Sequence, residues 1–387
     1  MQRIYMDNSA TSFPKPSSVT QAMVRFATDC GASAGRGAYA EAKQCERLVA
    51  QCRGQVADLI NSQSPERIVF ALNCSEALMI AIRGLLNTAP RGTHVITTAM
   101  EHNSVLRPLN ALAQQVGIEP QFIPCNPQTG LVDPDDIRRA IRPTTRLIAC
   151  VHVSNVTGTM QPIAQVCQIA REHGIASLVD AAQSAGHVEI DVQKLGVDFL
   201  AFPGHKGCMG PLGTGMLYVR PGMEDVLPTM KEGGTGTISE KATQPLTMPD
   251  KYEIGSHNAI GLAGLSEGLA WLMERGVGEV RRHDRELCRL FMELTDGIKG
   301  LTVYGPRNLD DRAGVFSMNI AGMTCNQLAD ALEMKAGVLS RPGLHCAPYA
   351  HQTIGTQSVG TCRLSFGPYT TSEHVRHAAD AIRQIVY

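Results

Sequence analysis

The sequence predicts an α/β protein with a large domain that holds a mostly parallel sheet and a smaller α+β domain. Three observations lead to this fold class. The chain has 387 residues, which is more than one hydrophobic core usually organises. Between about residues 67 and 220, short apolar segments alternate with helical stretches, the pattern of a parallel sheet that is covered on both faces. The last third of the chain does not follow this alternation.

The composition is that of an ordinary soluble globular protein, with 43% hydrophobic and 18% charged residues. The formal net charge of −1 does not suggest nucleic acid or an anionic membrane as a partner. No apolar run approaches the roughly 20 residues that span a bilayer, and the N-terminus lacks the apolar core of a signal peptide. We therefore expect a cytoplasmic protein. The 12 cysteines occur singly, without a CxxC pair, so we expect neither a disulfide framework nor a bound metal, and most should be small buried hydrophobes.

Five apolar segments are predicted as strands of the large sheet. Their near-continuous hydrophobicity fits strands that are buried on both faces. The strands are RIVFA (67–71), HVITTA (94–99), RLIACVHV (146–153), IASLVDAA (175–182) and VDFLAF (197–202). Helices are predicted between them at 76–86, 104–117 and 163–174.

The remainder of the chain divides into loops and a second set of elements. Segment 221–257 is rich in Gly, Pro, Thr and Lys and is predicted as long loops, which usually carry a function. A helix at 258–276 could link two domains. After it we expect another helix, strands near 301–304 and 314–320, a helix near 324–336, and a final helix that begins with a capping box from Thr370 to Glu373. The predicted large domain is 13–273, and the small domain combines 1–12 with 274–387.

Two polar residues follow neighbouring strands of the predicted sheet. Asp180 ends a strand in SLVDAAQSAGH, and ligands of open α/β sheets bind at the carboxyl ends of strands. A carboxylate there can pair with a protonated pyridine nitrogen and keep the ring of pyridoxal 5'-phosphate (PLP) an electron sink. Lys206 follows the next strand, in GHKG, 206 − 180 = 26 residues later, and a desolvated lysine can form an imine with this aldehyde cofactor. Taken alone, Asp180 also fits a helix N-cap and Lys206 a surface lysine, but the pair predicts a PLP site.

A phosphate site is predicted in NCSEAL (73–78). Ser75 and the amides around it would lie at a helix N-terminus after a strand, where free N–H groups and the helix dipole bind anions. The alternative is that Ser75 is an ordinary helix N-cap.

A candidate nucleophile lies in SRPGLHCAPYAH (340–351). Cys346 is in a loop beside His345, and a loop thiol in such a place can act as a nucleophile. The alternative is a buried, structural cysteine. Arg363 follows in GTCRLSFGPYTT and could clamp a substrate carboxylate through two parallel N–H bonds.

These motifs resemble the class V aminotransferase family within the fold-type I PLP enzymes, and more narrowly its cysteine desulfurase and selenocysteine lyase branch. The resemblance covers nearly the whole chain. It rests on the ordered set DNSATS, GRG (35–37), SEA, MEHNS (100–104), HVSNVTGT (152–159), DAAQ, GHK, EGGTG (232–236), the pair Gly255–Ser256, GLHCAP and Arg363.

The resemblance implies roles for individual residues. Lys206 would hold PLP and shuttle protons, and His102 would stack on the ring and act in acid–base chemistry. The other implied contacts are Asp180 with the ring nitrogen, Gln183 with the phenolic oxygen, Ser75, Cys74 and His205 with the phosphate, Asn155, Arg363 and Arg341 around the substrate carboxylate, and Ser256 with the phosphate of a partner subunit in a homodimer. Cys346 would take sulfur from L-cysteine as a persulfide, which leaves L-alanine.

The segment around Cys346 is compact, without a long Ser/Gly-rich insertion. It resembles the group-II desulfurases, whose sulfur usually passes to a dedicated acceptor protein. Two departures bear on PLP binding and substrate preference. Pro203 stands where the family usually has Ser or Thr, so a hydroxyl and a backbone N–H are missing, and Gly35 stands where group-II members often have histidine.

Three readings of function therefore stand side by side. The first is a cysteine desulfurase, with selenocysteine lyase as a close variant. The second is another class V aminotransferase or C–S lyase in which Cys346 has no chemical role, because fold does not settle function. The third is a PLP-type scaffold that binds a partner, and the joint presence of Lys206, Asp180, Arg363 and Cys346 argues against it.

Overall fold

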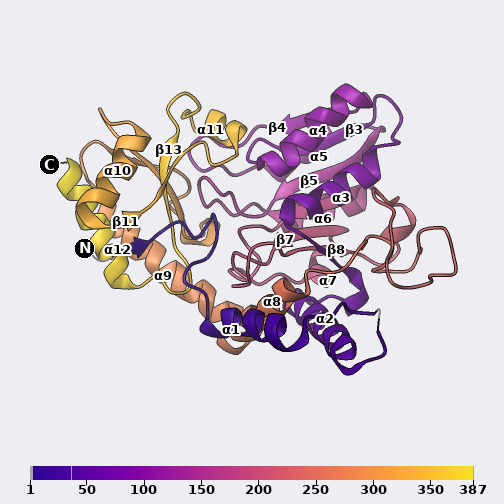
Figure 1. Cartoon of the computed structure of the whole chain (residues 1–387). Helices are drawn as coiled ribbons and strands as arrows, with labels where there is room; N and C mark the ends of the chain where they lie inside the picture. Colours follow the sequence, from indigo (N-terminus) through magenta and orange to yellow (C-terminus); the bar gives the residue numbers. More distant parts are fainter. Residues whose placement is uncertain (1–2, 36, 387) are drawn as a thin grey trace.

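A seven-stranded sheet forms the centre of the larger part of the molecule (Figure 1). The computed structural model describes residues 3–35 and 37–386. The strand order is β2-β8-β7-β6-β5-β3-β4, and β8 runs antiparallel to both neighbours while the other pairs are parallel. The strands are β2 (Ile68–Ala71), β3 (His94–Thr98), β4 (Glu119–Ile123), β5 (Thr145–Val151), β6 (Ala176–Asp180), β7 (Phe199–Pro203) and β8 (Gly215–Val219). The predicted mostly parallel sheet is confirmed, with β4 and β8 as strands that the sequence analysis did not propose.

Helices cover both faces of this sheet and make three layers. In β5, Leu147 and Ala149 pack in the core with α3 and α4, whereas Ile148 and Cys150 pack in the core with α2, α6 and α8. This alternation explains why the strand is apolar at nearly every position. The helices are α1 (Ser17–Arg25), α2 (Ala40–Leu59), α3 (Cys74–Leu86), α4 (Asn103–Gln115), α5 (Pro134–Ala140), α6 (Ile163–Glu172), α7 (Val192–Leu195) and α8 (Ala259–Arg275), with single helical turns at Phe26–Cys30, Pro65–Arg67, Met223–Asp225 and Leu309–Asp311.

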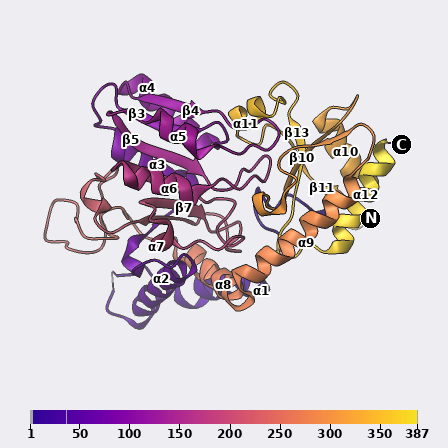
Figure 2. The ribbon, with the colours of Figure 1, turned by 180° about the vertical axis from the view of Figure 1, so that it is seen from behind.

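A second, four-stranded antiparallel sheet has its own hydrophobic core. Its order is β12-β13-β10-β9, and the first strand of the chain, β1, pairs instead with β11 beside it. Figures 1 and 2 show both termini at this end of the molecule, with α8 and α9 running between the two parts. The elements are β1 (Ile4–Tyr5), α9 (Val277–Thr295), β9 (Leu301–Val303), β10 (Val315–Ile320), α10 (Cys325–Ala336), β11 (Val338–Leu339), β12 (Arg341–Gly343), α11 (Pro348–Thr353), β13 (Thr361–Ser365) and α12 (Ser372–Val386). The domain limits, 13–273 for the large domain and 1–12 with 274–387 for the small domain, stay a prediction.

Strand β13 presents two chemically different faces. Cys362 and Leu364 lie in the hydrophobic core of the small sheet. Successive side chains of a strand alternate, so Thr361, Arg363 and Ser365 share the opposite face, and all three are buried. Ser365 Oγ there accepts a hydrogen bond from the Ser9 amide of the chain's N-terminal segment. Arg363 Nη1 on the same face donates to the carbonyl of Asn155, so this polar face of β13 meets both the N-terminal segment and the larger part.

The predicted capping box of the last helix is wrong by one residue. Thr371 Oγ1 accepts from the His374 amide at 3.2 Å, and the Thr371 amide donates to His374 Nδ1 at 3.3 Å. Thr370 is committed elsewhere, because its Oγ1 accepts from the Gly367 amide in the preceding turn. In the part of the chain that the structure describes, no helix is both long and apolar enough to cross a membrane.

Candidate active site

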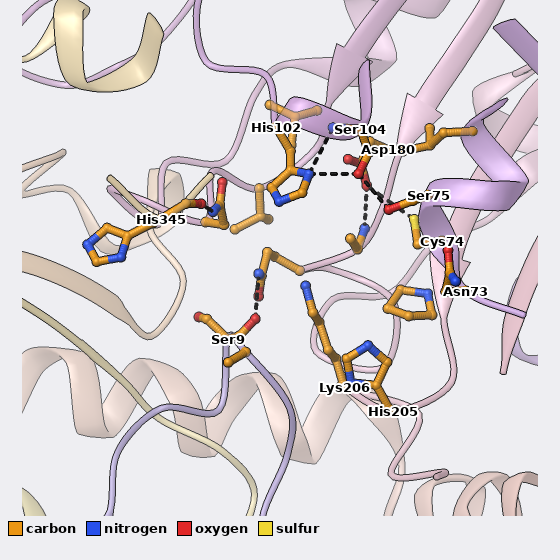
Figure 3. A pocket seen from close by; sticks show the side chains of 18 of the residues that line it. Ser9, Asn73, Cys74, Ser75, His102, Ser104, Asp180, His205, Lys206 and His345 are labelled. Carbon is orange, nitrogen blue, oxygen red and sulfur yellow. Dashed lines mark hydrogen bonds between the residues drawn. The ribbon is translucent and has the colours of Figure 1, made fainter. Parts of the chain in front are cut away.

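A cavity of about 240 Å³ lies where β6 and β7 end and where residues of the small sheet approach them. Most of the predicted site residues line it (Figure 3). Cys74 and Arg363, for example, are 363 − 74 = 289 residues apart in the sequence and meet in this cavity only through folding. The predicted residues that line the cavity are Cys74, Ser75, His102, Asn155, Asp180, Gln183, His205, Lys206, Arg341 and Arg363.

Asp180 and Lys206 both line this cavity, and their ionised side chains carry charges of opposite sign that attract each other. Asp180 is the last residue of β6, and its Oδ1 accepts from the Ala182 amide at 2.9 Å and lies 3.7 Å from Cys74 Sγ. Burial raises the pKa of Asp180 and lowers that of Lys206. Lys206 Nζ makes no hydrogen bond to any described residue, and Figure 3 shows the side chain reaching into the cavity. Lys206 is therefore not a solvated surface lysine, and Asp180 caps a turn with one oxygen while the other stays available.

The N-terminus of α3 supplies free donors at one end of the cavity. Asn73 is its N-cap and accepts from the Glu76 amide at 3.0 Å, so the alternative that Ser75 is the cap is wrong. The amides of Cys74 and Ser75 belong to the first helical turn, which has no acceptor within the helix. His205 lines the same cavity, and its buried Nδ1 has no partner among the described residues. This end of the cavity suits an anion such as phosphate.

His102 is held in one tautomer by the helix that it caps. Its Nδ1 accepts from the Ser104 amide at 3.1 Å, and an amide can only donate, so the neutral ring carries its proton on Nε2. Burial, with Lys206 and nearby arginines, lowers the pKa of His102 to about 4. The ring is therefore neutral at neutral pH and offers a flat face and one N–H donor. This geometry suits stacking and hydrogen bonding better than proton abstraction by Nδ1.

Two arginines make the other end of the cavity positive. Arg363 and Arg341 stand directly opposite each other on β13 and β12, and Arg363 is 1% exposed. Arg363 Nη2 contacts Asp7 Oδ1 at 2.5 Å and Nη1 donates to the Asn155 carbonyl at 3.0 Å, while its buried Nε has no partner among the described residues. A substrate carboxylate would match the remaining charge. Asp7 lies in the DNSATS motif but had no predicted role, and only its contact with Arg363 identifies it as a site residue.

Cys346 does not line the cavity but lies beside it. The residue is exposed, so the alternative of a buried structural cysteine is wrong, and Arg341 Nη2 lies 3.6 Å from its Sγ. The His345 ring does not contact this thiol and hydrogen-bonds Thr361 Oγ1 at 3.0 Å instead. All 12 cysteines are free, and apart from Cys346 and half-buried Cys30 they are buried, as predicted.

Ser256 lies outside this cavity and lines a separate one. Its loop is anchored by the buried carboxylate of Glu253, which pairs with two Arg53 nitrogens at 2.6 and 2.9 Å and with the His257 ring at 2.6 Å. Arg36 of the GRG motif lies outside the described residues.

Comparison with known proteins identifies the family. The family model described as aminotransferase class-V matches residues 4–377. The chain belongs to this family. Its fold follows the same pattern: an apo structure of cysteine desulfurase from Thermococcus onnurineus NA1 superposes with a TM-score of 0.93 at 35% identity, covering 99% of this chain and 94% of the other.

Two further proteins with cysteine desulfurase in their names are similar to this chain over nearly its full length. A protein from Methanothermobacter thermautotrophicus that carries the name probable cysteine desulfurase is 35% identical over 99% of this chain and 94% of its own length. The crystal structure of the cysteine desulfurase CsdA from Escherichia coli has a TM-score of 0.88 at 29% identity and covers 98% of this chain and 94% of the other. The predicted family and fold are therefore confirmed.

Proposed function

We propose that this protein is a PLP-dependent cysteine desulfurase that converts L-cysteine to L-alanine. The carbon–sulfur bond of the substrate breaks, the sulfur joins Cys346 as a persulfide, and the hydrogen of the Cys346 thiol is balanced by the hydrogen that alanine gains. The observation that carries the proposal is one cavity that holds Lys206, Asp180 and Arg363, with the exposed Cys346 at its margin. The relatives named cysteine desulfurase support the same reaction.

The residues of the cavity fit PLP. Within the part of the chain that the structure describes, the buried Asp180 carboxylate has no cation in hydrogen-bond contact, and a protonated ring nitrogen would supply one. Lys206 is a half-buried amine without a partner among the described residues, and the first amides of α3 together with His205 can hold the phosphate. When bound, PLP supplies a conjugated ring that withdraws electrons from the substrate's Cα.

The protein's own groups hold the substrate and move its proton. The guanidinium groups of Arg363, through its Nε, and of Arg341 provide the positive charge that binds and orients the substrate carboxylate. Lys206 lies where it can take a proton from Cα and return it, since burial favours its neutral amine. His102 would stack on the pyridine ring of PLP and can donate one hydrogen bond from its Nε2.

Replacing Asp180 by Asn is expected to lower turnover by about 100-fold, which corresponds to roughly 3 kcal/mol of transition-state stabilisation. The amide keeps the size and the turn contact with Ala182 but has no charge to stabilise a protonated ring nitrogen. PLP content, measured after release from the protein, should fall much less, because the phosphate contacts remain. Asp198 is a suitable control, because it is a buried carboxylate directly before β7 that binds Ser177 and Arg220 away from the cavity. Turnover equal to the wild type in Asp180→Asn would show that Asp180 only caps the turn.

Product analysis with L-cysteine tests the proposed reaction directly. Alanine and protein-bound persulfide should appear in equal amounts in the first turnover. A parallel assay with L-selenocysteine separates desulfurase from selenocysteine lyase. Conversion of the cofactor to its amine form by α-keto acids, without alanine from cysteine, would instead establish an aminotransferase.

We also infer that the protein acts as a homodimer and passes its sulfur to an acceptor protein in the cytoplasm. Ser256 supports the dimer, because it lies outside the cavity of its own chain on a loop held by Glu253. Exposed apolar side chains near that loop, Leu72, Ile254 and Ile260, would gain burial in such an interface.

Light scattering is expected to give twice the chain mass of 41.6 kDa. Ser256→Ala should weaken PLP retention in dialysis while Ser239→Ala, in the same long loop region, should not. A fully active monomer would contradict this assignment.

A further inference from the structure

The segment 344–347, here called the Cys346 loop, has a backbone that its residues do not favour. The Ala347 amide donates to the Leu344 carbonyl at 3.0 Å and closes a tight turn. Both central residues have positive φ, 49° at His345 and 60° at Cys346. Turns of this kind are dominated by Gly, Asn and Asp, because a side chain in the left-handed region is strained. Such strain persists only where surrounding contacts hold it.

Two hydrogen bonds to backbone carbonyls of this loop attach it to the large part of the molecule. The Asn103 amide, at the start of α4, donates to the Cys346 carbonyl at 2.7 Å. Asn155 Nδ2 donates to the His345 carbonyl at 2.5 Å. The loop therefore lies against both the helix that His102 caps and the segment proposed to bind the substrate carboxylate.

A buried chain of hydroxyl groups holds the loop from the other side. His345 Nε2 contacts Thr361 Oγ1 at 3.0 Å, Thr361 donates to Ser317 Oγ at 3.0 Å, and Ser317 donates to the Val156 carbonyl at 2.7 Å. His345 is 2% exposed, and Thr361 and Ser317 are fully buried. Hydrogen bonds in such a place are costly to break, because no water replaces them.

The donor of every hydrogen bond in this series can be assigned by starting from its last acceptor, the Val156 carbonyl. The Val156 carbonyl can only accept, so the one hydroxyl proton of Ser317 is used there. Thr361 must then donate to Ser317, and His345 must donate from Nε2. Burial lowers the pKa of His345 to about 2, which agrees with a neutral ring. Figure 3 shows this ring turned away from Lys206 and Asp180.

We propose that His345, Thr361 and Ser317 are positioning residues that lock the Cys346 loop to the Asn155–Val156 segment, so that the thiol is presented to a bound substrate. The chain begins on the loop and ends on the residue next to Asn155, whose side chain binds the loop again. The loop of the nucleophile and the segment of the carboxylate pocket are therefore joined twice, once directly by Asn155 and once through the buried hydroxyl groups. The role in sulfur transfer rests on the proposed function, but the locking of the loop does not.

Thr361→Val tests the proposal, because it keeps the side-chain shape and removes the hydroxyl. Turnover of L-cysteine should fall about tenfold, with KM and PLP content within about twofold of the wild type. Hydrogen exchange at the Asn103 amide, measured by mass spectrometry on the apo protein, should become faster, since its acceptor belongs to the loop. Thr361→Ser keeps the hydroxyl and should restore both quantities.

Thr356 offers a matched control. Its Oγ1 hydrogen-bonds the His351 ring at 2.7 Å and the residue is equally buried, but it does not belong to the hydrogen-bonded series His345–Thr361–Ser317. Thr356→Val should leave turnover and Asn103 exchange unchanged. Ser317→Ala serves if Thr361→Val does not fold, and it should reproduce the same two effects.

Unchanged Asn103 exchange in Thr361→Val, loss of function in Thr361→Ser, or an equal effect of Thr356→Val would each overturn the proposal. A wild-type protein without desulfurase activity would refute the proposed function alone, because the exchange measurement would still test the locking of the loop.

Discussion

Lys206→Ala is expected to give a colourless protein whose turnover of L-cysteine is at least about 10³-fold below the wild type. The wild type should be yellow from the imine that PLP forms with the Lys206 amine. No other lysine lines the cavity among the described residues, so none can replace it. The measurements are the visible absorption spectrum and alanine production.

Lys206→Arg and a second lysine sharpen this test. Arginine keeps the positive charge but is not expected to form the imine, so Lys206→Arg should be as inactive as the alanine variant. Lys15 is the matched control, because burial lowers its pKa to about 8 while its Nζ donates to the His205 carbonyl at 3.1 Å outside the cavity. Lys15→Met should stay yellow. A colourless wild type that cannot be reconstituted with PLP would refute the cofactor assignment.

Cys346→Ala is expected to stay yellow and to bind L-cysteine, yet to lose alanine production by more than about 100-fold. The sulfur that leaves the substrate needs an acceptor, and Cys346 is the exposed thiol beside Arg341 and the cavity. The spectral change on adding L-cysteine should therefore persist while alanine and persulfide do not form.

Cys30→Ala is the control for this variant, since Cys30 is the next most accessible thiol and lies away from the cavity. It should produce alanine at the wild-type rate. Wild-type desulfuration by Cys346→Ala would mean that the cysteine has no chemical role and that the protein is a lyase or an aminotransferase.

Several features of the site could be predicted because they depend on local order along the chain. Asp180 and Lys206 each follow a buried strand, and parallel neighbouring strands bring their carboxyl ends to one edge of the sheet. The sequence therefore placed both in one site. It could not place Asp7 with Arg363, a contact across 356 residues, because no local pattern records which distant strand lies beside which.

Adjacency in sequence was also misleading in one place. His345 precedes Cys346, which suggested that the two act together, but the left-handed turn directs the ring to Thr361 and leaves Arg341 beside the thiol. The predicted N-cap of α12 was one residue too early for a similar reason, because Thr370 Oγ1 accepts a hydrogen bond from Gly367 in the preceding turn.

The alternation of strands and helices, the small α+β part and the chemical groups that the reaction requires could all be predicted, because periodic burial and short motifs act over a few residues. Which of these groups meet depends on long-range packing. The alternation of β13 placed Cys362 and Leu364 in a core and turned Thr361 and Arg363 toward the other sheet. Hydrogen-bond direction, tautomers and the shape of the Cys346 loop follow only from those long-range contacts, since each depends on a partner that the local sequence does not specify.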